Sequence, residues 1–351
     1  TLAATINAMQ TGHTQRVSLT VPADIDGHGG TGETARTGRA LEPAQSAPMI
    51  VLAQVPNADA SELSTKMLAA AYAKPWPGTI RLTDSGGQGL AEIDNPNAIG
   101  ILQEDVPIAH QIAMWAHDQS LLVRMLEGHL SSASASAVLQ GLNRLWVECA
   151  DGTWEQIGFA NATLVAPKTY RLTQLLRGLG KTQFAARKAS VAGGRVLVVG
   201  DTKALDMNSE LVGANLELYA YAGAASPEAI SLGFTPQPDA LLPLAPVHVS
   251  AKRDPLTQDI NIQWVRCTRI GGDMWQGADV PLDTDNLQFN LRIGVGDTVA
   301  RVTQVSQSNF TYTSAAQVSD FGALADGIWI EIDQHSAIWG AGHGKRIEFS
   351  D

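Results

Sequence analysis

The sequence predicts a mainly β protein, with an antiparallel β-rich domain followed by a β-sandwich. Its apolar runs are short and alternate with polar residues, which is the pattern of strands rather than of long helices. Glycine occurs 33 times and proline 16 times, often between these runs. Hydrophobic residues make up 44% and charged residues 17% of the 351 residues, so a chain long enough for two or three domains can form real cores.

Residues 1–48 are predicted to hold an N-terminal strand and a flexible insert. Thr1–Met9 is interpreted as the end of a helix or strand that begins upstream, and the alternation of Arg16–Pro22 predicts a strand. Asp24–Pro43 is rich in glycine and poor in large apolar residues, which predicts a loop or a disordered insert. Because the first residue is Thr1 rather than Met, we expect the chain to be a piece or processed product of a longer protein.

Residues 49–235 are predicted to form one antiparallel β domain. Met49–Leu52 is an apolar run that predicts a buried strand, whereas Ser61–Ala73 has apolar residues at helical spacing and predicts a helix that Pro75–Gly78 ends. Leu130–Leu142 is small and serine-rich, which predicts a short helix or loop. Further strands are predicted at Thr79–Thr83, Ala98–Leu102, Gln111–Trp115, Leu121–Leu126, Arg195–Val199 and Leu216–Tyr221.

The centre of this domain is predicted to be a compact β-meander between Gly141 and Thr182. It contains four strand-like runs, in which Asp151-Gly152 is a hairpin signal and Pro167-Lys168 a second break. The runs are Leu145–Cys149, Trp154–Ile157, Ala160–Val165 and Tyr170–Leu176. The segment Arg177–Gly180 follows and predicts a basic corner, since its glycines can adopt backbone angles that other residues avoid.

Residues 236–246 contain four prolines without a periodic pattern, which predicts a linker. Residues 247–351 then show about seven short alternating runs with an early core tryptophan, Trp264. This spacing is typical of a sandwich and predicts a fibronectin type III-like module. Six of these runs are Val247–Val249, Ile260–Val265, Leu287–Ile293, Val299–Val302, Phe310–Tyr312 and Ile328–Ile332.

Charge and cysteine content narrow the function classes. The formal net charge of −11 disfavours a protein that coats nucleic acid or adheres to anionic membranes, and we expect no specific nucleic-acid binding. No apolar run reaches the roughly 18 residues that a membrane span requires. Cys149 and Cys267 lie in separate strand-like runs, so we expect buried free thiols rather than a disulfide.

Motifs that could carry chemistry are incomplete. Gly178–Thr182 is similar to the end of a phosphate-binding loop, but Leu175 stands where that loop needs its first glycine. Asp84–Gly87 matches the nucleophile region of chymotrypsin-like proteases but follows a predicted strand as a turn would. Glu104 and Asp105, if on a strand, point to opposite faces and cannot flank one glycosidic bond. We therefore expect no enzyme, no cofactor and no metal site.

Four residues are the candidate interface residues. Five tryptophans lie in predicted strands and are expected in the core: Trp115, Trp146, Trp154, Trp264 and Trp329. Trp76, Trp275 and Trp339 instead lie beside Pro or Gly turns, where they could serve as contact hot spots. Arg177 at the basic corner is the fourth candidate.

Several separated motifs resemble the late part of the tail-hub proteins of tailed phages and gene transfer agents, also called host-specificity or megatron proteins. The first is Pro75-Trp76-Pro77-Gly78, which is intact. The second is the Ala162–Thr182 phrase, which keeps Leu175-Leu176-Arg177-Gly178 but departs from the family pattern at Gly180-Lys181. The third is Gly272–Trp275 with Val280–Leu282 in the last module. The resemblance covers roughly residues 49–351.

The resemblance implies a structural component of a virion tail tip or baseplate hub. It implies a symmetric homo-oligomer, with three copies expected, that contacts other tail and baseplate proteins and contributes to host attachment or genome delivery. Two alternatives stay open. One is a module that binds a host-surface glycan or receptor, which exposed Trp275 and Trp339 would favour. The other is a tail-associated hydrolase, which a cleft with converging carboxylates would favour.

Overall fold

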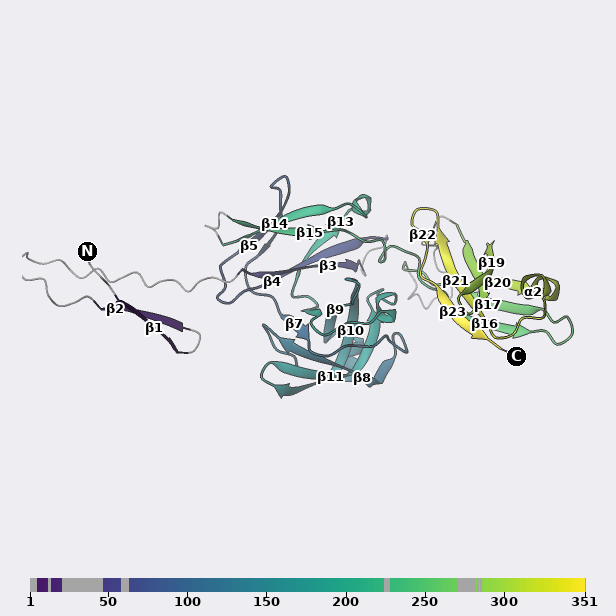
Figure 1. The fold of residues 1–351 in the computed structure, drawn as a ribbon, viewed down its shortest axis with the longest axis horizontal. Helices are drawn as coiled ribbons and strands as arrows, with labels where there is room; N and C mark the ends of the chain where they lie inside the picture. Colours follow the sequence, from purple (N-terminus) through teal and green to yellow (C-terminus); the bar gives the residue numbers. More distant parts are fainter. Residues whose placement is uncertain are drawn as a thin grey trace, which may run out of the picture. The chain divides into compact units, whose positions relative to one another are not determined.

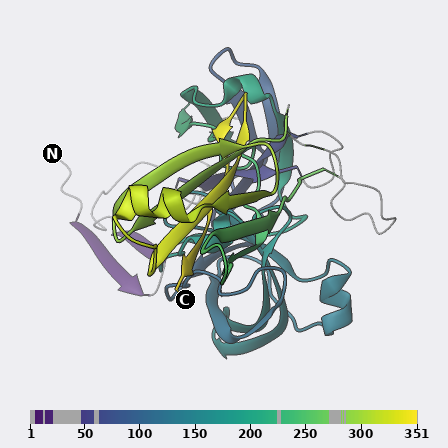
Figure 2. The ribbon, with the colours of Figure 1, turned by 90° about the vertical axis from the view of Figure 1, so that its right-hand side faces the viewer.

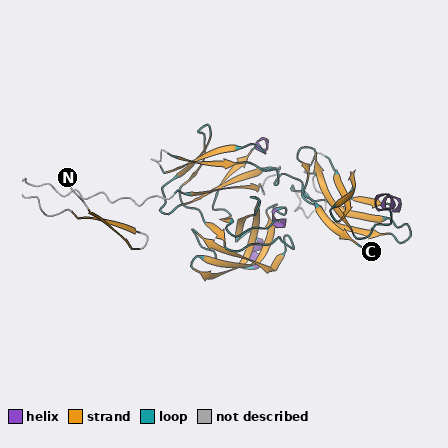
Figure 3. Cartoon of the chain, viewed as in Figure 1, coloured by secondary structure: helices purple, strands orange, loops and turns teal. Residues whose placement is uncertain are grey.

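A computed structural model describes residues 5–11, 14–20, 47–57, 63–223, 228–270, 282, 284 and 286–350. The chain forms two compact units, residues 1–47 and 48–351, and each is described by itself. Strands dominate the secondary structure and helices are few and short (Figure 3). The mainly β, antiparallel prediction is therefore confirmed. None of the helices in the described ranges is long and apolar enough to cross a membrane.

The first unit contains an antiparallel hairpin. Strands β1 (Thr5–Thr11) and β2 (Thr14–Thr20) pair from Thr5 opposite Thr20 to Thr11 opposite Thr14. The strand predicted within Arg16–Pro22 thus corresponds to β2, and the segment before it is a strand rather than a helix. The predicted insert Asp24–Pro43 lies outside the described residues.

The second unit contains a closed six-stranded barrel (Figure 1). Its order is β10-β11-β8-β7-β12-β9, and alternate residues of each strand fill its interior, among them Leu121, Val123, Leu145, Ile157 and Phe159. The strands are β7 (Ile99–Leu102), β8 (Trp115–Met125), β9 (Arg144–Glu148), β10 (Trp154–Ala166), β11 (Thr169–Leu179) and β12 (Arg195–Val198). The short helices α1 (Ala135–Leu139) and η1 (Ala185–Arg187) connect them.

Two further sheets complete residues 48–235. One has the order β13-β4-β3 and the other β15-β14-β5-β6. Val51 and Leu68 of the first sheet pack with Trp146 and Trp154 of the barrel, and its opposite face packs against the second sheet. The strands are β3 (Met49–Pro56), β4 (Thr65–Tyr72), β5 (Ile80–Asp84), β6 (Gly89–Ile93), β13 (Lys203–Met207), β14 (Leu216–Ala222) and β15 (Ala229–Phe234). The 3₁₀ helix η2 (Ser209–Leu211) follows β13.

The helix predicted at Ser61–Ala73 is wrong, because Thr65–Tyr72 is strand β4. This strand is central in its sheet and contributes to two cores, with Leu68 and Ala70 on one face and Met67, Ala69 and Ala71 on the other. A strand that is buried on both faces has no polar alternation, so its apolar spacing does not distinguish it from a helix. Pairing with β3 and β13 overrides the helical propensity of its alanines.

The central meander has three strands rather than four. The predicted runs Trp154–Ile157 and Ala160–Val165 are one 13-residue strand, β10, which continues past a register shift between Gln156 and Gly158. Its first half is buried and pairs with both β9 and β11, whereas its second half pairs with β11 alone among the described strands and is mostly exposed. Likewise, the strand predicted at Gln111–Trp115 begins only at Trp115, as part of β8.

Residues 247–350 form the predicted fibronectin type III-like sandwich (Figure 2). The sheet β16-β17-β20 faces the sheet β19-β18-β21 with β23, and Trp264 packs edge-on against Phe289 in their core at 5.3 Å between ring centroids. The strands are β16 (Val247–Arg253), β17 (Ile260–Val265), β18 (Phe289–Val295), β19 (Thr298–Val305), β20 (Asn309–Tyr312), β21 (Ile328–Ser336), β22 (Gly340–Ala341) and β23 (Lys345–Phe349). Helix α2 (Ser314–Phe321) was not predicted.

The proline-rich segment 236–246 is irregular, but it is packed rather than free. Ala240, Leu241 and Leu244 are buried. Gln54 of β3 accepts a hydrogen bond from the Gln237 backbone N–H at 2.6 Å and donates one to the Gln237 carbonyl at 2.9 Å. The segment is therefore irregular and in contact with β3, and its four prolines do not reveal what covers them.

Candidate functional site

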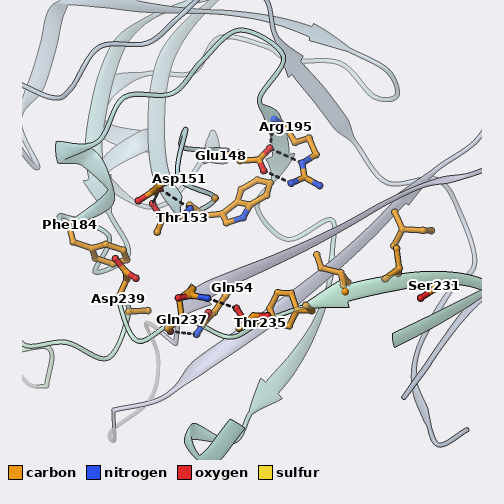
Figure 4. Close-up of a pocket in the computed structure, with 18 residues that line it drawn as sticks. Gln54, Glu148, Asp151, Thr153, Phe184, Arg195, Ser231, Thr235, Gln237 and Asp239 are labelled. Atoms are coloured by element: carbon orange, nitrogen blue, oxygen red, sulfur yellow. Dashed lines mark hydrogen bonds and ion pairs between the residues drawn. The ribbon is translucent and has the colours of Figure 1, made fainter. Parts of the chain in front are cut away.

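A groove of about 670 Å³ lies beside the barrel, between β3, β15 and the turn that joins β9 to β10 (Figure 4). Its wall is mixed polar and apolar, and it carries three carboxylates and one arginine. The lining residues used below are Gln54, Glu148, Asp151, Trp154, Phe184, Arg195, Gln237 and Asp239. The turn that exposes Asp151 is the predicted Asp151-Gly152 hairpin, in which Asp151 accepts hydrogen bonds from Thr153.

Arg195 and Glu148 form a bidentate ion pair on the groove wall. The Arg195 Nε lies 2.7 Å from Glu148 Oε2, and its Nη2 contacts Oε1. The two side chains come from the start of β12 and the end of β9, which are neighbours in the barrel. Arg195 also lies over the ring of Trp154, 5.8 Å from its centroid. The hydrogen bonds from Arg195 to Glu148 raise the pKa of Arg195, so this guanidinium is charged at neutral pH.

Lys188 joins the other two carboxylates. Its Nζ lies 2.6 Å from Asp151 Oδ2 and 2.9 Å from Asp239 Oδ1. Burial by itself would raise the pKa of Asp151, but hydrogen bonds from Lys188 and Thr153 outweigh it and lower that pKa. Burial by itself would lower the pKa of Lys188, and the bonds to both carboxylates raise it instead. Asp151 is therefore ionised at neutral pH and lacks the proton that a general acid must supply.

The charged side chains of the groove are paired with one another. Each carboxylate among its described lining residues has a cationic partner, and the described residues contain no cluster of three potential metal ligands. Retaining and inverting glycosidases use two carboxyls that flank one bond, whereas the three described carboxylates of the groove each contact a lysine or an arginine.

Arg177, a candidate interface residue, is in the core instead. Its side chain is fully buried and binds Glu155, also fully buried, through two contacts of 2.8 Å. Its Nη1 donates to Gln119 Oε1 at 2.7 Å and to the Pro107 carbonyl. Gly178 N–H donates to Glu155 Oε1 at 2.8 Å. The predicted basic corner is present, but the Arg177 side chain points into the core. A fully buried side chain cannot contact a partner protein in this fold.

The remaining candidates do not converge on one site. Trp76, between β4 and β5, is half-buried against the core of the second sheet and donates from Nε1 to the Asp94 carbonyl at 3.0 Å. Trp339 is half-buried in the turn between β21 and β22, where its backbone N–H donates to Ser336 Oγ. Trp275 lies outside the described residues. Trp76 and Trp339 therefore lie in loops beside different sheets.

The motifs that sequence reasoning set aside have structural roles. Asp84–Gly87 is the turn between β5 and β6, in which Asp84 Oδ1 accepts from Gly86 and Gln88. Thr182 closes the Gly178–Thr182 corner by donating to the Leu179 carbonyl at 2.6 Å.

Glu104 and Asp105 lie in a loop rather than on the imagined strand, and each has its own partner, Arg171 for Glu104 and the Ala192 N–H for Asp105.

Both cysteines are free thiols, as predicted, and burial together with the nearby Glu155 raises the pKa of Cys149 to about 11. Cys149 is buried, whereas Cys267 is only half-buried.

A second group, the junction cluster, consists of Phe184, Arg269 and His343. Arg269 is 3% exposed, lies over the Phe184 ring and donates to the carbonyls of Leu242 and Lys181 at 2.8 and 2.9 Å. The His343 ring stacks on the Phe184 ring with 4.8 Å between the ring centroids. Its Nε2 lies 2.8 Å from the Asp239 carbonyl oxygen. Nothing in the local sequence indicates this cluster, because its members are separated by more than 70 residues.

Comparison with protein families gives one match. Residues 97–197 match the family described as Rcc01698-like, C-terminal, and this range nearly coincides with the barrel strands β7 to β12. No curated protein matches the chain.

Two solved structures have low similarity to the chain. The fibronectin domains FN1–FN3 of chicken CNTN1 are 9% identical, with 88% of this chain and 99% of that chain covered and a TM-score of 0.22. Domains 7, 8 and 9 of the S-layer protein SbsC are 10% identical, with 82% and 69% covered and a TM-score of 0.18. TM-scores this low support no inference about the chain. The informative similarity is the match of residues 97–197 to the Rcc01698-like C-terminal family.

Proposed function

We propose that the chain is a structural part of the tail tip or baseplate hub of a phage-like particle, such as a gene transfer agent. The observation that carries the proposal is the match of residues 97–197 to the Rcc01698-like C-terminal family, which is associated with gene transfer agents. The match falls on the barrel, where the Ala162–Thr182 phrase of the tail-hub pattern also lies. Host attachment and genome delivery are the roles that such a position serves.

The architecture of the second unit is suited to a structural role. The barrel is closed, which leaves few free strand edges, and a buried ion pair and the junction cluster fix its corners. The groove carries paired charges rather than a reactive carboxyl. A structural role uses these features directly, whereas a hydrolase would use none of them.

The end of the β10–β11 hairpin is the surface we propose for contact with another copy, because β10 pairs there with β11 alone among the strands that the structure describes. Leu164 and Val165 are 61% and 51% exposed there, although both are large and apolar. Burial of such side chains on assembly is favourable, at about 25 cal/mol for each Å² of apolar surface. A symmetric oligomer of three copies would cover this hairpin without creating an open-ended array.

The particle itself provides the first test. An antibody or gold label on a C-terminal tag of the full-length protein is expected to mark one end of the tail in electron micrographs. Mass spectrometry of purified particles is expected to find the protein at a few copies per particle, against hundreds for a shell protein. Label on the shell or along the whole tube would contradict the proposal.

Charged substitutions test the contact surface. The double substitution Leu164→Asp and Val165→Asp is expected to shift the purified protein from oligomer to monomer in light scattering, because aspartate cannot be buried without a partner. Folding should be unchanged, since both side chains are exposed. Val302→Asp, at a 66% exposed position of β19, is the matched control and should leave the oligomer intact. An unchanged mass in the double variant would exclude this hairpin as the interface.

A further inference from the structure

A second cavity, of about 650 Å³, has a different chemistry from the groove. It is lined by the segment around Ile108–Ile112, by η1, by the end of the proline-rich segment and by the start of β23. Its ionisable lining residues are Arg187, Lys345, Arg346, His110, His248, His343 and Cys267, and no aspartate or glutamate is among its described lining residues. This is unexpected in a chain whose net charge is −11.

Arg187 is the main observation. It is half-buried, and its Nη1 donates to the Gly344 carbonyl at 2.9 Å, which uses one of the five N–H donors of a guanidinium. None of the described carboxylates forms an ion pair with it. Burial lowers the pKa of Arg187, and only the nearby Cys267 acts in the opposite sense. A guanidinium taken partly out of water without a counter-charge is unfavourable, and an incoming anion would relieve that cost.

Lys345 supplies a second cation at the same cavity. It is half-buried at the start of β23, two residues after His343. Arg346 is already engaged, since it lies over the Trp329 ring at 4.3 Å and its Nε is 3.4 Å from Glu348. Arg187 and Lys345 are therefore the charges available to a ligand.

The backbone that presents these cations is fixed before any ligand arrives. His343 stacks on Phe184, and its backbone N–H donates to the Pro243 carbonyl at 2.9 Å. Arg187 in turn holds the Gly344 carbonyl. A preorganised site loses little conformational entropy on binding. The lining also includes the apolar side chains of Ile108, Leu244 and Val247, which can cover the uncharged part of a ligand.

We propose that this cavity binds an oxyanion, with Arg187 and Lys345 as its cationic donors. Carboxylate, phosphate and sulfate groups all accept charge-assisted hydrogen bonds from arginine and lysine. Such a group could be free in solution or carried on an acidic sugar. The inference rests on the cavity and its charges alone, and it stands whether or not the chain belongs to a tail.

Calorimetry with the whole chain tests the proposal. Inorganic phosphate, sulfate and glucuronate are titrated in turn at constant ionic strength with chloride as the balancing ion. At least one is expected to bind saturably, and the preferred probe tells a sugar carboxylate from a free phosphate or sulfate. Arg187→Gln and Lys345→Gln are each expected to weaken that binding by about tenfold or more, the effect of losing one hydrogen bond to a charged group.

The control is Lys203→Gln, which removes the same charge from an exposed position on β13 and should leave the affinity within about twofold. If Arg187→Gln impairs folding, Lys345→Gln still decides the matter, because Lys345 forms no ion pair with the described residues. Binding of none of the three anions would overturn the proposal. Equal weakening by Lys203→Gln and Lys345→Gln would also overturn it, because it would show only a general charge effect.

Discussion

Replacing Arg177 by methionine is expected to lower the free energy of unfolding by about 3–5 kcal/mol. The substitution leaves Glu155 fully buried without its cation, and a lone buried charge is among the most destabilising defects known in proteins. It also removes the partner of Gln119 Oε1. Urea denaturation at neutral pH, followed by tryptophan fluorescence, measures the effect.

The exposed pair Arg171–Glu104 provides the matched control. Its bidentate geometry is similar, with contacts of 3.1 and 3.2 Å, but both side chains face solvent. Arg171→Met is therefore expected to cost less than about 1 kcal/mol. The double variant Arg177→Met, Glu155→Gln should recover part of the loss, because it no longer contains an unpaired buried carboxylate. Equal costs at positions 171 and 177 would contradict the structure of the barrel corner.

Acidification is expected to destabilise the protein through His343. Burial lowers the pKa of His343 to about 4, with Arg269 and Lys188 adding to the effect and the Asp239 carbonyl opposing it. Between pH 6.5 and about 4, His343 is therefore protonated in the unfolded chain but neutral in the folded chain. Stability is full above pH 6.5 and falls as the pH approaches 4, with no further loss below. Since one pKa unit corresponds to about 1.4 kcal/mol, the total loss in the free energy of unfolding is about 3 kcal/mol.

The difference between the wild type and His343→Gln isolates this contribution. Glutamine keeps a donor for the Asp239 carbonyl but does not titrate. Between pH 7.5 and 4.5 the wild type is expected to lose about 2–3 kcal/mol more than the variant, since every other group titrates in both proteins. Parallel stability curves would show that His343 is not held neutral in the junction cluster.

Strands with one buried face were predictable because apolar and polar residues alternate along their sequence. Ile260–Trp264 alternates apolar and polar residues, and in β17 the same residues alternate between buried and exposed. Fully buried or bent strands were not. β4 lost its alternation because both faces are covered, and the two halves of β10 read as separate strands because its burial changes midway. In both cases the missing information is the identity of the neighbouring surface.

The sites depended on tertiary structure more strongly than the fold did. Arg177 next to two glycines reads as an exposed corner, because a sequence does not show that Glu155 lies 2.8 Å away inside a barrel. The groove and the cavity that contains Arg187 and Lys345 are lined by residues that are distant in sequence. No local sequence pattern therefore predicted either of them.

By itself, the sequence determined the β class, the sandwich with its core Trp264, and the absence of a disulfide, since these follow from local period and residue type. It also showed the resemblance of the barrel phrase to tail hubs, which the match of residues 97–197 supports at the level of the Rcc01698-like family. Only the tertiary structure decided which charges are buried in ion pairs, as Arg177 is, and which line a cavity without a carboxylate partner among the described residues, as Arg187 does. Desolvation and pairing are properties of three-dimensional surroundings, which the order of residues does not show.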